Sequence, residues 1–446
     1  MEPQPEIAIP SISLASYGRL LSGNRNFRRL WMAQIVSEIG DWFYTLSIYT
    51  LLLQLTGRPS SVALALVLQV LPQTLVGPTA GVINDRLRRK HVMIAADLVR
   101  FVIVLAMLLV RSRSTVWLVY PLLLGETIMA AFFEPARSSV VPNIAARGEV
   151  LIANTLSSVT WSVNLLIGAS VGGLVAAFYG RNAVFILNAL SFLASALLIS
   201  GMRFAEPHAD SAAPLRPRDL VDFSPVLEGI RYVRNHSLLF PTIFAKAGEL
   251  MIGPSWVIFT VMGEREFALH WRGMTTARGG MLGMSILLGG RGLGAMIGPL
   301  VVARWAARND RRLQLGILFG YLTVAVGYGV LGSARTVWMA AACAMLAHAG
   351  GSTVWVFSTT LLQLHTEDRF RGRVFAADLG LSMLTIAAGA YFCGRFMDWG
   401  VSARTVATGT GMIMLAPAAL WGLAMRGAMK KSEAEASNLD NSNLAG

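Results

Sequence analysis

The chain has 446 residues, of which 54% are hydrophobic and only 14% are charged, and its formal net charge is +13. Soluble domains carry about 25% charged residues, so this composition argues against a soluble multidomain protein and indicates a surface that faces lipid. The positive charge does not indicate nucleic-acid binding, because such proteins gather their basic residues on one face. Here the longest basic run is only Arg88-Arg89-Lys90. Both cysteines, Cys343 and Cys393, lie inside apolar segments, which argues against a disulfide framework.

Apolar runs recur along the whole chain. A helix of about 20 apolar residues crosses a hydrocarbon core of about 30 Å. Runs of this kind are predicted at 30–55, 60–83, 92–112, 116–139, 151–178, 182–202, 238–262, 281–304, 312–333, 336–362, 374–398 and 402–425. The sequence therefore predicts an all-α membrane protein with twelve transmembrane helices in two six-helix bundles.

The basic residues between these runs predict the orientation of the chain. Of the 38 Lys and Arg residues, 25 fall on the side that holds both termini and only 9 fall on the other side. Because cytoplasmic loops carry the excess of Lys and Arg, both termini are expected in the cytoplasm. The expected location is the plasma (inner) membrane, which the chain crosses many times.

The predicted spans fall into two halves. In chain order we expect a cytoplasmic N-terminal segment, an N-terminal six-helix bundle, a cytoplasmic linker, a C-terminal six-helix bundle and a disordered cytoplasmic tail, at 1–29, 30–202, 203–237, 238–425 and 426–446. Within the linker, residues 222–235 are expected to form a short surface helix. Two six-helix halves are typical of a duplicated transporter whose site lies between them.

The loop after the second span reads Gly81-Val-Ile-Asn-Asp85-Arg86-Leu-Arg88-Arg89-Lys90. It resembles the signature loop of the major facilitator superfamily, Gly-x-x-x-Asp-Arg-x-Gly-Arg-Arg, with Arg88 where the family usually has glycine. Gly81 is expected to allow close helix packing. Positive charge that merely sets the topology is the alternative.

The charged residues of this loop are expected to form a conformational latch with charges elsewhere on the same side. A partner of Asp85 is expected among Arg100, Arg137, Arg371 and Arg373. The full set of latch candidates is Gly81, Asp85, Arg86, Arg89, Lys90, Asp97, Arg100, Arg371 and Arg373.

The fifth span contains Gly168-Ala169-Ser-Val-Gly172-Gly173. It resembles the Gly-Pro-x-x-Gly-Gly end of a motif found in antiporters of the superfamily, with Ala169 in place of the proline. Gly168, Gly172 and Gly173 are expected to let this helix press against its neighbour across the interface between the halves. A plain packing motif is an equally good interpretation.

Further stretches resemble the branch of the superfamily that includes macrolide efflux proteins and the enterobactin exporter. These stretches are Gly40-Asp41-Trp42, Asp97-Leu-Val-Arg100, Phe132-Phe133-Glu134-Pro135-Ala136 and Arg291-Gly-Leu-Gly294. The resemblance covers roughly residues 25–425. It implies a two-bundle fold, alternating access and ion-coupled export.

Ionisable side chains inside a bilayer are costly, and they normally face a cavity or a partner. Near mid-depth of the predicted spans lie Asp41, Glu126, Lys246, Glu249, Arg291 and His348. Asp41, Glu126 and Glu249 are the candidates for proton coupling, because a desolvated carboxyl group can lose its charge in one state of a transport cycle.

Each of these groups also has a structural interpretation. Asp41 could brace the packed start of the cavity, and Glu126 could pair with a basic group. Lys246 could pair with Glu249, three residues further along the same helical face. Arg291 could bond carbonyls freed by close packing, and His348 could be a hydrogen-bonded interior histidine.

Aromatic, amide and basic residues of the spans are candidates for lining a substrate cavity. They are Tyr44, Trp161, Asn164, Lys246, Arg291, His348 and Trp355. Such a lining suits a bulky, partly apolar ligand. Packing between helices or against lipid is the alternative for each aromatic residue.

No pattern of catalytic or metal-ligating residues is found in the sequence. The glycine-rich stretch Gly289–Gly294 lies inside a span and follows no predicted strand, so it does not indicate a dinucleotide site. No Walker loop for ATP is found either. The sequence therefore predicts no cofactor, no metal and no enzyme, and a proton gradient is the expected energy source.

The function predicted is secondary active transport, namely proton-coupled efflux of an amphipathic small molecule such as a drug or a siderophore, by alternating access. One alternative is a lipid or lysophospholipid flippase of the same fold. Another is a membrane sensor or assembly partner that does not transport. The expected partners are a small-molecule substrate and membrane lipid but no nucleic acid, and a monomer is expected.

Overall fold

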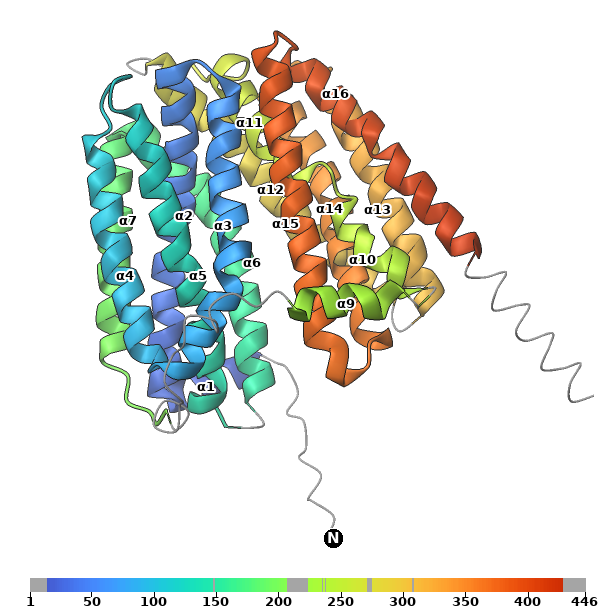
Figure 1. Cartoon of the computed structure of the whole chain (residues 1–446). Helices are drawn as coiled ribbons and strands as arrows, with labels where there is room; N and C mark the ends of the chain where they lie inside the picture. The colour runs from blue at the N-terminus through green and yellow to red at the C-terminus, as the bar shows by residue number, and fades with distance from the viewer. Residues whose placement is uncertain are drawn as a thin grey trace, which may run out of the picture. The chain divides into compact units, whose positions relative to one another are not determined.

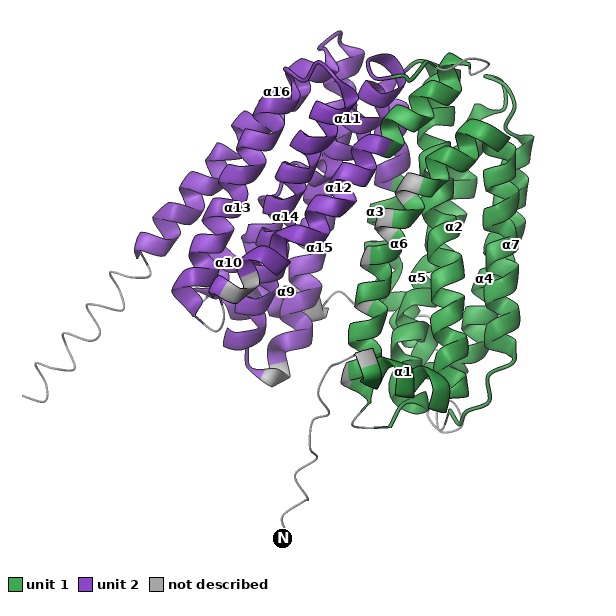
Figure 2. Ribbon diagram, turned by 180° about the vertical axis from the view of Figure 1, so that it is seen from behind, with its two compact units in different colours: residues 1–57, 68–222, 268–285 green, residues 58–67, 223–267, 286–446 purple. Residues whose placement is uncertain are grey.

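The computed structural model describes residues 14–146, 149–206, 224–234, 236, 238–270, 275–306 and 309–427. Helices account for all the regular structure in these residues, which contain no strand. The predicted all-α fold is therefore confirmed. The chain divides into two compact units: unit 1 holds residues 1–57, 68–222 and 268–285, and unit 2 holds residues 58–67, 223–267 and 286–446 (Figure 2). The bundle boundaries expected from the sequence stay predictions.

Unit 1 is built around the long helix α2, which packs against both α6 and α7, while α4 packs against α5 and α7 (Figure 1). The short helix α1, which the sequence did not predict, packs against α2. The helices of the first half of the chain are α1 (Leu14–Gly23), α2 (Arg25–Thr56), α3 (Pro59–Arg86), α4 (Arg89–Ala106), α5 (Val119–Ile144), α6 (Val150–Tyr179) and α7 (Arg181–Ser200), with short 3-10 turns η1 (Met107–Leu109) and η2 (Val116–Leu118). The first residues of α3 belong to unit 2.

The ends of α2 are defined by local chemistry. The Asn24 side chain caps the helix by accepting a hydrogen bond from the Phe27 backbone N–H at 2.9 Å. At the other end Gly57 adopts a φ of 70°, a left-handed conformation that glycine reaches at little cost. The capped helix α2 has 32 residues, which at 1.5 Å per residue is more than enough to cross a membrane.

Unit 2 contains most of the second half of the chain. Its helices are α9 (Ser224–Arg234), α10 (Leu239–Ala247), α11 (Ile252–Arg265), α12 (Thr276–Ala306), α13 (Asp310–Leu331), α14 (Val337–His365), α15 (Asp368–Asp398) and α16 (Ala403–Ile413), followed by helical residues 415–427. The first residues of α12 belong to unit 1. Glycines 290, 294 and 298 face the backbone carbonyls of residues 341, 345 and 349 on α14. The glycine-rich stretch is therefore a close helix contact of the kind membrane proteins use.

Across the described residues, nine helices are long and apolar enough to cross a membrane. Helices α2 and α6, with 32 and 30 residues, cover two further predicted spans. The predicted span at 238–262 is interrupted, because α10 ends at Ala247 and α11 begins at Ile252. Pro254, which has no N–H to donate, fits in the first turn of α11 but would break a continuous helix. The count of twelve spans stays a prediction.

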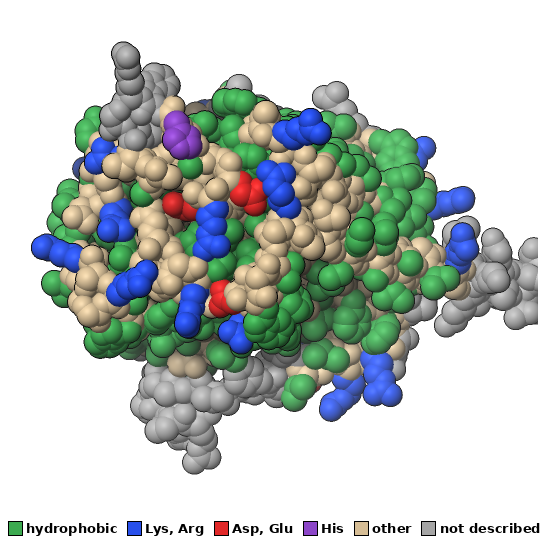
Figure 3. Space-filling model, turned by 90° about the horizontal axis from the view of Figure 1, so that it is seen from above, with side chains coloured by type: hydrophobic (Ala, Val, Ile, Leu, Met, Phe, Trp, Pro, Cys, Tyr) green, Lys and Arg blue, Asp and Glu red, His purple; other side chains and the backbone are tan. Residues whose placement is uncertain are grey.

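The surface of the helices is rich in exposed apolar side chains, such as Val102, Leu300 and Leu420, each more than 60% exposed. Lys and Arg side chains gather on the end face shown in Figure 3, where they outnumber Asp and Glu. Exposed apolar flanks are what a lipid environment allows, because water would penalise them.

The linker helix predicted near residues 222–235 is confirmed as α9. It packs against α15, with Glu228 paired to Arg373 at 2.8 Å and Tyr232 stacked on Phe370 at 4.3 Å. Of the tail expected to be disordered, residues 426 and 427 are helical and the remainder lies outside the described residues.

Candidate functional site

Arg100 of α4 is the centre of a charge network inside unit 1. Its Nη2 lies 2.8 Å from Asp41 Oδ2 on α2 and 2.8 Å from Glu126 Oε1 on α5. Its Nη1 lies 3.7 Å from Asp97 Oδ1, one turn earlier on α4. The guanidinium also lies 3.9 Å from the centre of the Phe192 ring on α7. Four helices therefore place three carboxyl groups and an aromatic ring around one cation.

The members of this network differ in exposure. The side chains of Arg100, Asp97 and Glu126 are at most 9% exposed, whereas that of Asp41 is 34% exposed. Asp41 Oδ1 accepts no hydrogen bond from the described residues. Asp41 is therefore the most exposed of these four groups, although its Oδ1 atom is buried.

The charges of the network do not balance. With all three carboxyl groups ionised, one guanidinium would leave two negative charges uncompensated. Keeping uncompensated charge in a buried site costs several kcal/mol. Balancing the network would therefore take a further positive charge or a proton at one of the three carboxyl groups.

A second network of polar side chains is centred on α2. Glu38 accepts hydrogen bonds from Gln34 Nε2 and Asn164 Nδ2, both at 2.8 Å. Gln34 Oε1 in turn accepts a bond from Arg137 Nη1 at 3.1 Å, and Arg137 pairs with Glu134 at 2.8 Å. This series of hydrogen bonds connects α2, α5 and α6 and includes Asn164, a predicted cavity residue.

The sequence interpretation missed Glu38. An acidic residue inside the first predicted span, three positions before Asp41, was a sufficient signal to include it. Glu38 and Asp41 lie on one side of α2, because residues three apart are neighbours on a helix surface.

Two aromatic residues expected near a cavity have different surroundings. Tyr44 is buried in the packed interior of unit 1, where its ring meets Phe185 edge-on at 5.9 Å. Trp161 is 49% exposed and contacts Trp42 edge-on at 6.1 Å. Trp161, but not Tyr44, therefore has surface to offer a ligand.

In unit 2, the predicted pairing of Lys246 with Glu249 is wrong. Lys246 forms a buried ion pair with Asp378 of α15, and its ammonium lies 4.8 Å from the centre of the Trp355 ring. Glu249 lies in the break between α10 and α11 and is buried. The prediction assumed one continuous helix, and the break removes that geometry.

The other two ionisable candidates of unit 2 lie in one aromatic cluster. Arg291 donates to Ser255 Oγ at 3.2 Å and lies 4.2 Å from the centre of the Trp256 ring. His348 is buried and its Nε2 lies 3.3 Å from the Tyr328 hydroxyl. Arg291 thus contacts a hydroxyl and an indole ring, and its expected bonds to freed carbonyls stay a prediction.

The loop between α3 and α4 ties helix ends together. Asp85 pairs with Arg89 at 3.3 Å, and its side chain is 73% exposed. Arg89 also donates to the Ser139 carbonyl of α5 at 3.1 Å, and Lys90 donates to the Met202 carbonyl after α7 at 2.8 Å. The basic residues of this loop therefore join α4 to α5 and to the end of α7.

The partners expected for Asp85 have other roles in the described structure. Arg100, together with Asp97, belongs to the buried network rather than to the loop. Arg137 pairs with Glu134 and Arg373 pairs with Glu228. Within unit 1, Asp85 pairs with Arg89, four residues along the chain, and not with Arg100 or Arg137. A contact of Asp85 with Arg371 or Arg373 stays a prediction.

Other residues of the predicted latch also differ from expectation. Arg88 has φ −65° and ψ 111°, an ordinary extended conformation, so the chain does not need glycine there. A Cβ added to Gly81 would have no neighbour within 4 Å, so the expected close packing is not seen. Arg371 is exposed on α15.

The glycines of α6 press this helix onto α2. A Cβ at Gly168 would lie 2.6 Å from Trp42 Cβ, and one at Gly172 would lie 2.9 Å from Phe43 Cα. A Cβ at Gly173 would overlap Ser285, also in unit 1. The expected role between the halves is therefore corrected for Gly168 and Gly172, whose neighbours lie on α2 of the same half. Gly173 meets a residue of α12, a helix of the predicted C-terminal half, as expected. Helix α6 runs unbroken past Ala169.

We expect Gly172→Ala to destabilise the protein by about 1–3 kcal/mol, because the added methyl group must displace the α2 backbone. The matched control is Gly77→Ala, where nothing lies within 4 Å of the new Cβ. Thermal unfolding of the two variants in the same detergent measures the difference. Equal melting temperatures would contradict the packing role of Gly172.

Comparison with known proteins agrees with this architecture. The sequence profile of the transmembrane secretion effector family matches residues 21–445. The MFS-type transporter YfiS of Bacillus subtilis is 24% identical, over 89% of this chain and 93% of its own. Macrolide efflux protein A of Streptococcus pyogenes is also 24% identical, over 87% of this chain and 94% of its own.

Solved structures show the same fold. The nucleoside transporter NupG superposes with a TM-score of 0.71 at 9% identity, over 89% of this chain and 99% of its own. A bacterial homolog of the human lysosomal transporter Spinster superposes with a TM-score of 0.67 at 15% identity. The match covers 90% of this chain and 96% of the homolog.

The matched family and these relatives consist of membrane transporters, which are not enzymes. This chain belongs to the transmembrane secretion effector family of the major facilitator superfamily. Members of this superfamily bind small-molecule substrates.

Proposed function

We propose that this protein exports an amphipathic small molecule in exchange for protons, by alternating access, across the plasma (inner) membrane. Both termini would face the cytoplasm, as the excess of basic residues on that side favours. The observation that carries the proposal is the network of Asp41, Glu126 and Asp97 around Arg100.

A coupling group must change its charge without leaving a buried partner unpaired. When Asp41 is ionised, it shares Arg100 with Glu126. When Asp41 takes up a proton, Glu126 still compensates the guanidinium, so protonation removes excess negative charge rather than stranding a cation. This is the behaviour that proton exchange requires of a carboxyl group in a membrane.

The substrate class follows from what lies near the network. Trp161 offers an exposed indole ring, and Asn164, one turn further along α6, donates to Glu38. An apolar surface beside a carboxylate and an amide suits a ligand with a large apolar part and a polar or cationic group. The similarity to macrolide efflux protein A supports export as the direction.

The experiment uses everted membrane vesicles that contain the overproduced protein and maintain an acidic interior. We expect a labelled macrolide to accumulate inside, and its addition to release part of the pH gradient, as reported by a pH-sensitive dye. Collapsing the pH and electrical gradients together should stop accumulation. Accumulation that survives the loss of both gradients would contradict proton coupling.

A second assay separates export from lipid movement. Purified protein in liposomes should leave the leaflet distribution of labelled lysophospholipid unchanged. Rapid movement of that lipid, without macrolide transport in the vesicles, would replace the proposal with a flippase function.

A further inference from the structure

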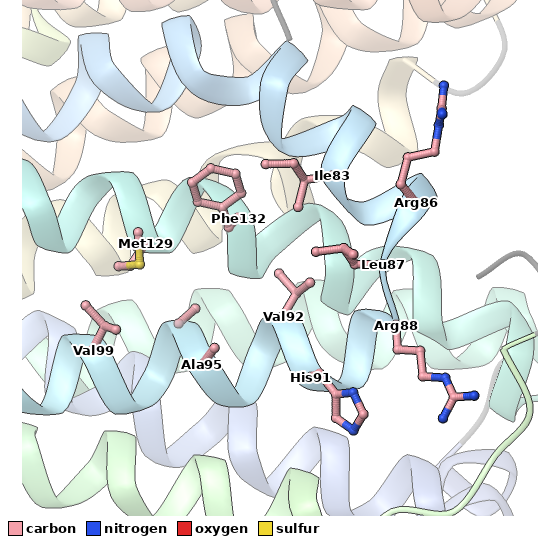
Figure 4. Close-up of a pocket in the computed structure, with 11 residues that line it drawn as sticks. Ile83, Arg86, Leu87, Arg88, His91, Val92, Ala95, Val99, Met129 and Phe132 are labelled. Atoms are coloured by element: carbon pink, nitrogen blue, oxygen red, sulfur yellow. The ribbon is translucent and has the colours of Figure 1, made fainter. Parts of the chain in front are cut away.

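Unit 1 has a groove of about 700 Å³ that is lined by α3, α4 and α5. Its walls are mainly apolar, and in Figure 4 the Arg86 side chain at one end points away from Arg88 and His91. The groove therefore does not bring its three basic residues together. A polar group that is both enclosed and short of partners lies in unit 2 instead, at Glu249.

Glu249 lies between α10 and α11, and its side chain is enclosed by unit 2. The residue is only 2% exposed. Its Oε1 atom is buried and accepts no hydrogen bond from the described residues. On α14, the backbone of Trp355 faces the carboxyl group, and a Cβ added to Gly351 would lie 3.4 Å from Glu249 Oε2. The carboxyl group is therefore packed against a helix rather than exposed to water.

The cation next to Glu249 already has a partner. Lys246, three residues earlier in the chain, is the described cation whose charge acts on Glu249. Its ammonium group is hydrogen-bonded to Asp378 of α15 and lies 4.8 Å from the centre of the Trp355 ring. A charge-assisted hydrogen bond and an aromatic face both favour a charged lysine and an ionised aspartate. Lys246 and Asp378 thus balance each other.

The other titratable neighbour of Glu249 is Tyr321 of α13. Its hydroxyl donates a hydrogen bond to the Ala245 carbonyl. An ionised Glu249 would therefore add an uncompensated charge to a buried pair that is already neutral, which costs several kcal/mol. A neutral carboxyl group is far less costly to bury than a carboxylate.

A proton is the cation that fits this position. A metal ion would need several oxygen ligands at once. Within the part of the chain that the structure describes, no group of three His, Cys, Asp or Glu side chains could bind one. A proton needs a single oxygen, which Oε1 of Glu249 provides.

We propose that Glu249 is a second proton site of this protein, which holds a proton in the described conformation and exchanges it in each export cycle. Asp41 belongs to unit 1 and Glu249 to unit 2, so each unit would carry one proton. The exchange rests on the proposed proton-coupled export, whereas the bound proton rests only on the surroundings of Glu249.

Infrared spectroscopy of the purified full-length chain detects protonated carboxyl groups without any transport assay. We expect the wild type to show a component of the carboxylic acid band that is missing in Glu249→Gln. The control Glu228→Gln removes an exposed carboxylate that pairs with Arg373, and it should leave this band unchanged. Identical carboxylic acid bands in Glu249→Gln and the wild type would overturn the proposal.

Thermal unfolding in detergent compares Glu249 with the carboxylate that does pair with Lys246. Glu249→Gln exchanges one neutral group for another of the same size, so its melting temperature should stay within about 2 °C of the wild type. Asp378→Asn leaves a buried lysine unpaired and should lower the melting temperature by about 5 °C or more. Equal losses in the two variants would show that Glu249 is ionised and would overturn the proposal. Stabilisation by sodium chloride over choline chloride that Glu249→Gln abolishes would replace the proton with a sodium ion.

Everted vesicles test the exchange itself. Glu249→Gln should release about half as many protons per accumulated macrolide as the wild type, because one of two exchanging carboxyl groups is lost. An unchanged ratio would overturn the exchange at Glu249. If the wild type released no protons, the proposed coupling of export would fail as well, while the infrared band would still decide whether Glu249 holds a proton.

Discussion

Asp41→Asn is expected to abolish uphill export while the protein still folds and binds its substrate. Asparagine keeps the size of the side chain and can still accept a hydrogen bond from Arg100, but it cannot exchange a proton. Accumulation of labelled macrolide in everted vesicles should fall to the level of vesicles without the protein. Exchange of labelled for unlabelled macrolide, with no gradient, should persist.

Two further variants test whether the effect of Asp41→Asn comes from the loss of an ionisable group at position 41. Asp41→Glu keeps an ionisable group and should retain part of the uphill transport, with a different dependence on pH. Glu126→Gln removes a neighbouring carboxyl group that is more deeply buried. Full uphill transport by Asp41→Asn would show that Asp41 is not the essential proton carrier, and Glu126 would then be the next candidate.

Arg100→Met is expected to cost the protein about 3–5 kcal/mol of stability, the usual result of breaking a buried ion pair by removing one partner. Three carboxyl groups would lose their shared cation. Folded yield and thermal unfolding in detergent measure the loss. The control Arg28→Met, at an exposed position of α2, should unfold within a few degrees of the wild type.

A combined variant distinguishes charge from packing. If the loss in Arg100→Met comes from uncompensated carboxylates, adding Asp41→Asn, Asp97→Asn and Glu126→Gln should restore much of the stability. If the loss comes from missing contacts of the long arginine side chain, neutralising the three carboxyl groups will not restore the stability. That second outcome would remove the electrostatic account of the network.

The fold class was predictable from the sequence because hydrophobic runs of membrane length are rare outside membrane-spanning helices. The same reasoning placed the ionisable residues inside the helices, because their cost makes each one stand out in an apolar run. The sequence therefore predicts Asp41 and Glu126 as candidates without showing the partner of either one.

The pairing of those residues was not predictable. Periodicity shows which residues share a face of one helix, but not which helix lies opposite. Arg100 and Asp41 are 59 positions apart, and Lys246 and Asp378 are 132 apart. Glu249 was the best partner for Lys246 within one helix, whereas in the structure Lys246 pairs with Asp378 on another helix.

The break between α10 and α11 has a mechanical consequence. The backbone hydrogen bonds that begin inside it span two or three residues: Glu249 N–H donates to the Lys246 carbonyl, Leu250 N–H to the Gly248 carbonyl and Ile252 N–H to the Glu249 carbonyl. Two short rods that meet at a joint can change their mutual angle without stretching a continuous ladder of bonds. Lys246 lies just before this joint and Glu249 lies inside it, so a change in the charge of either one would act at the joint.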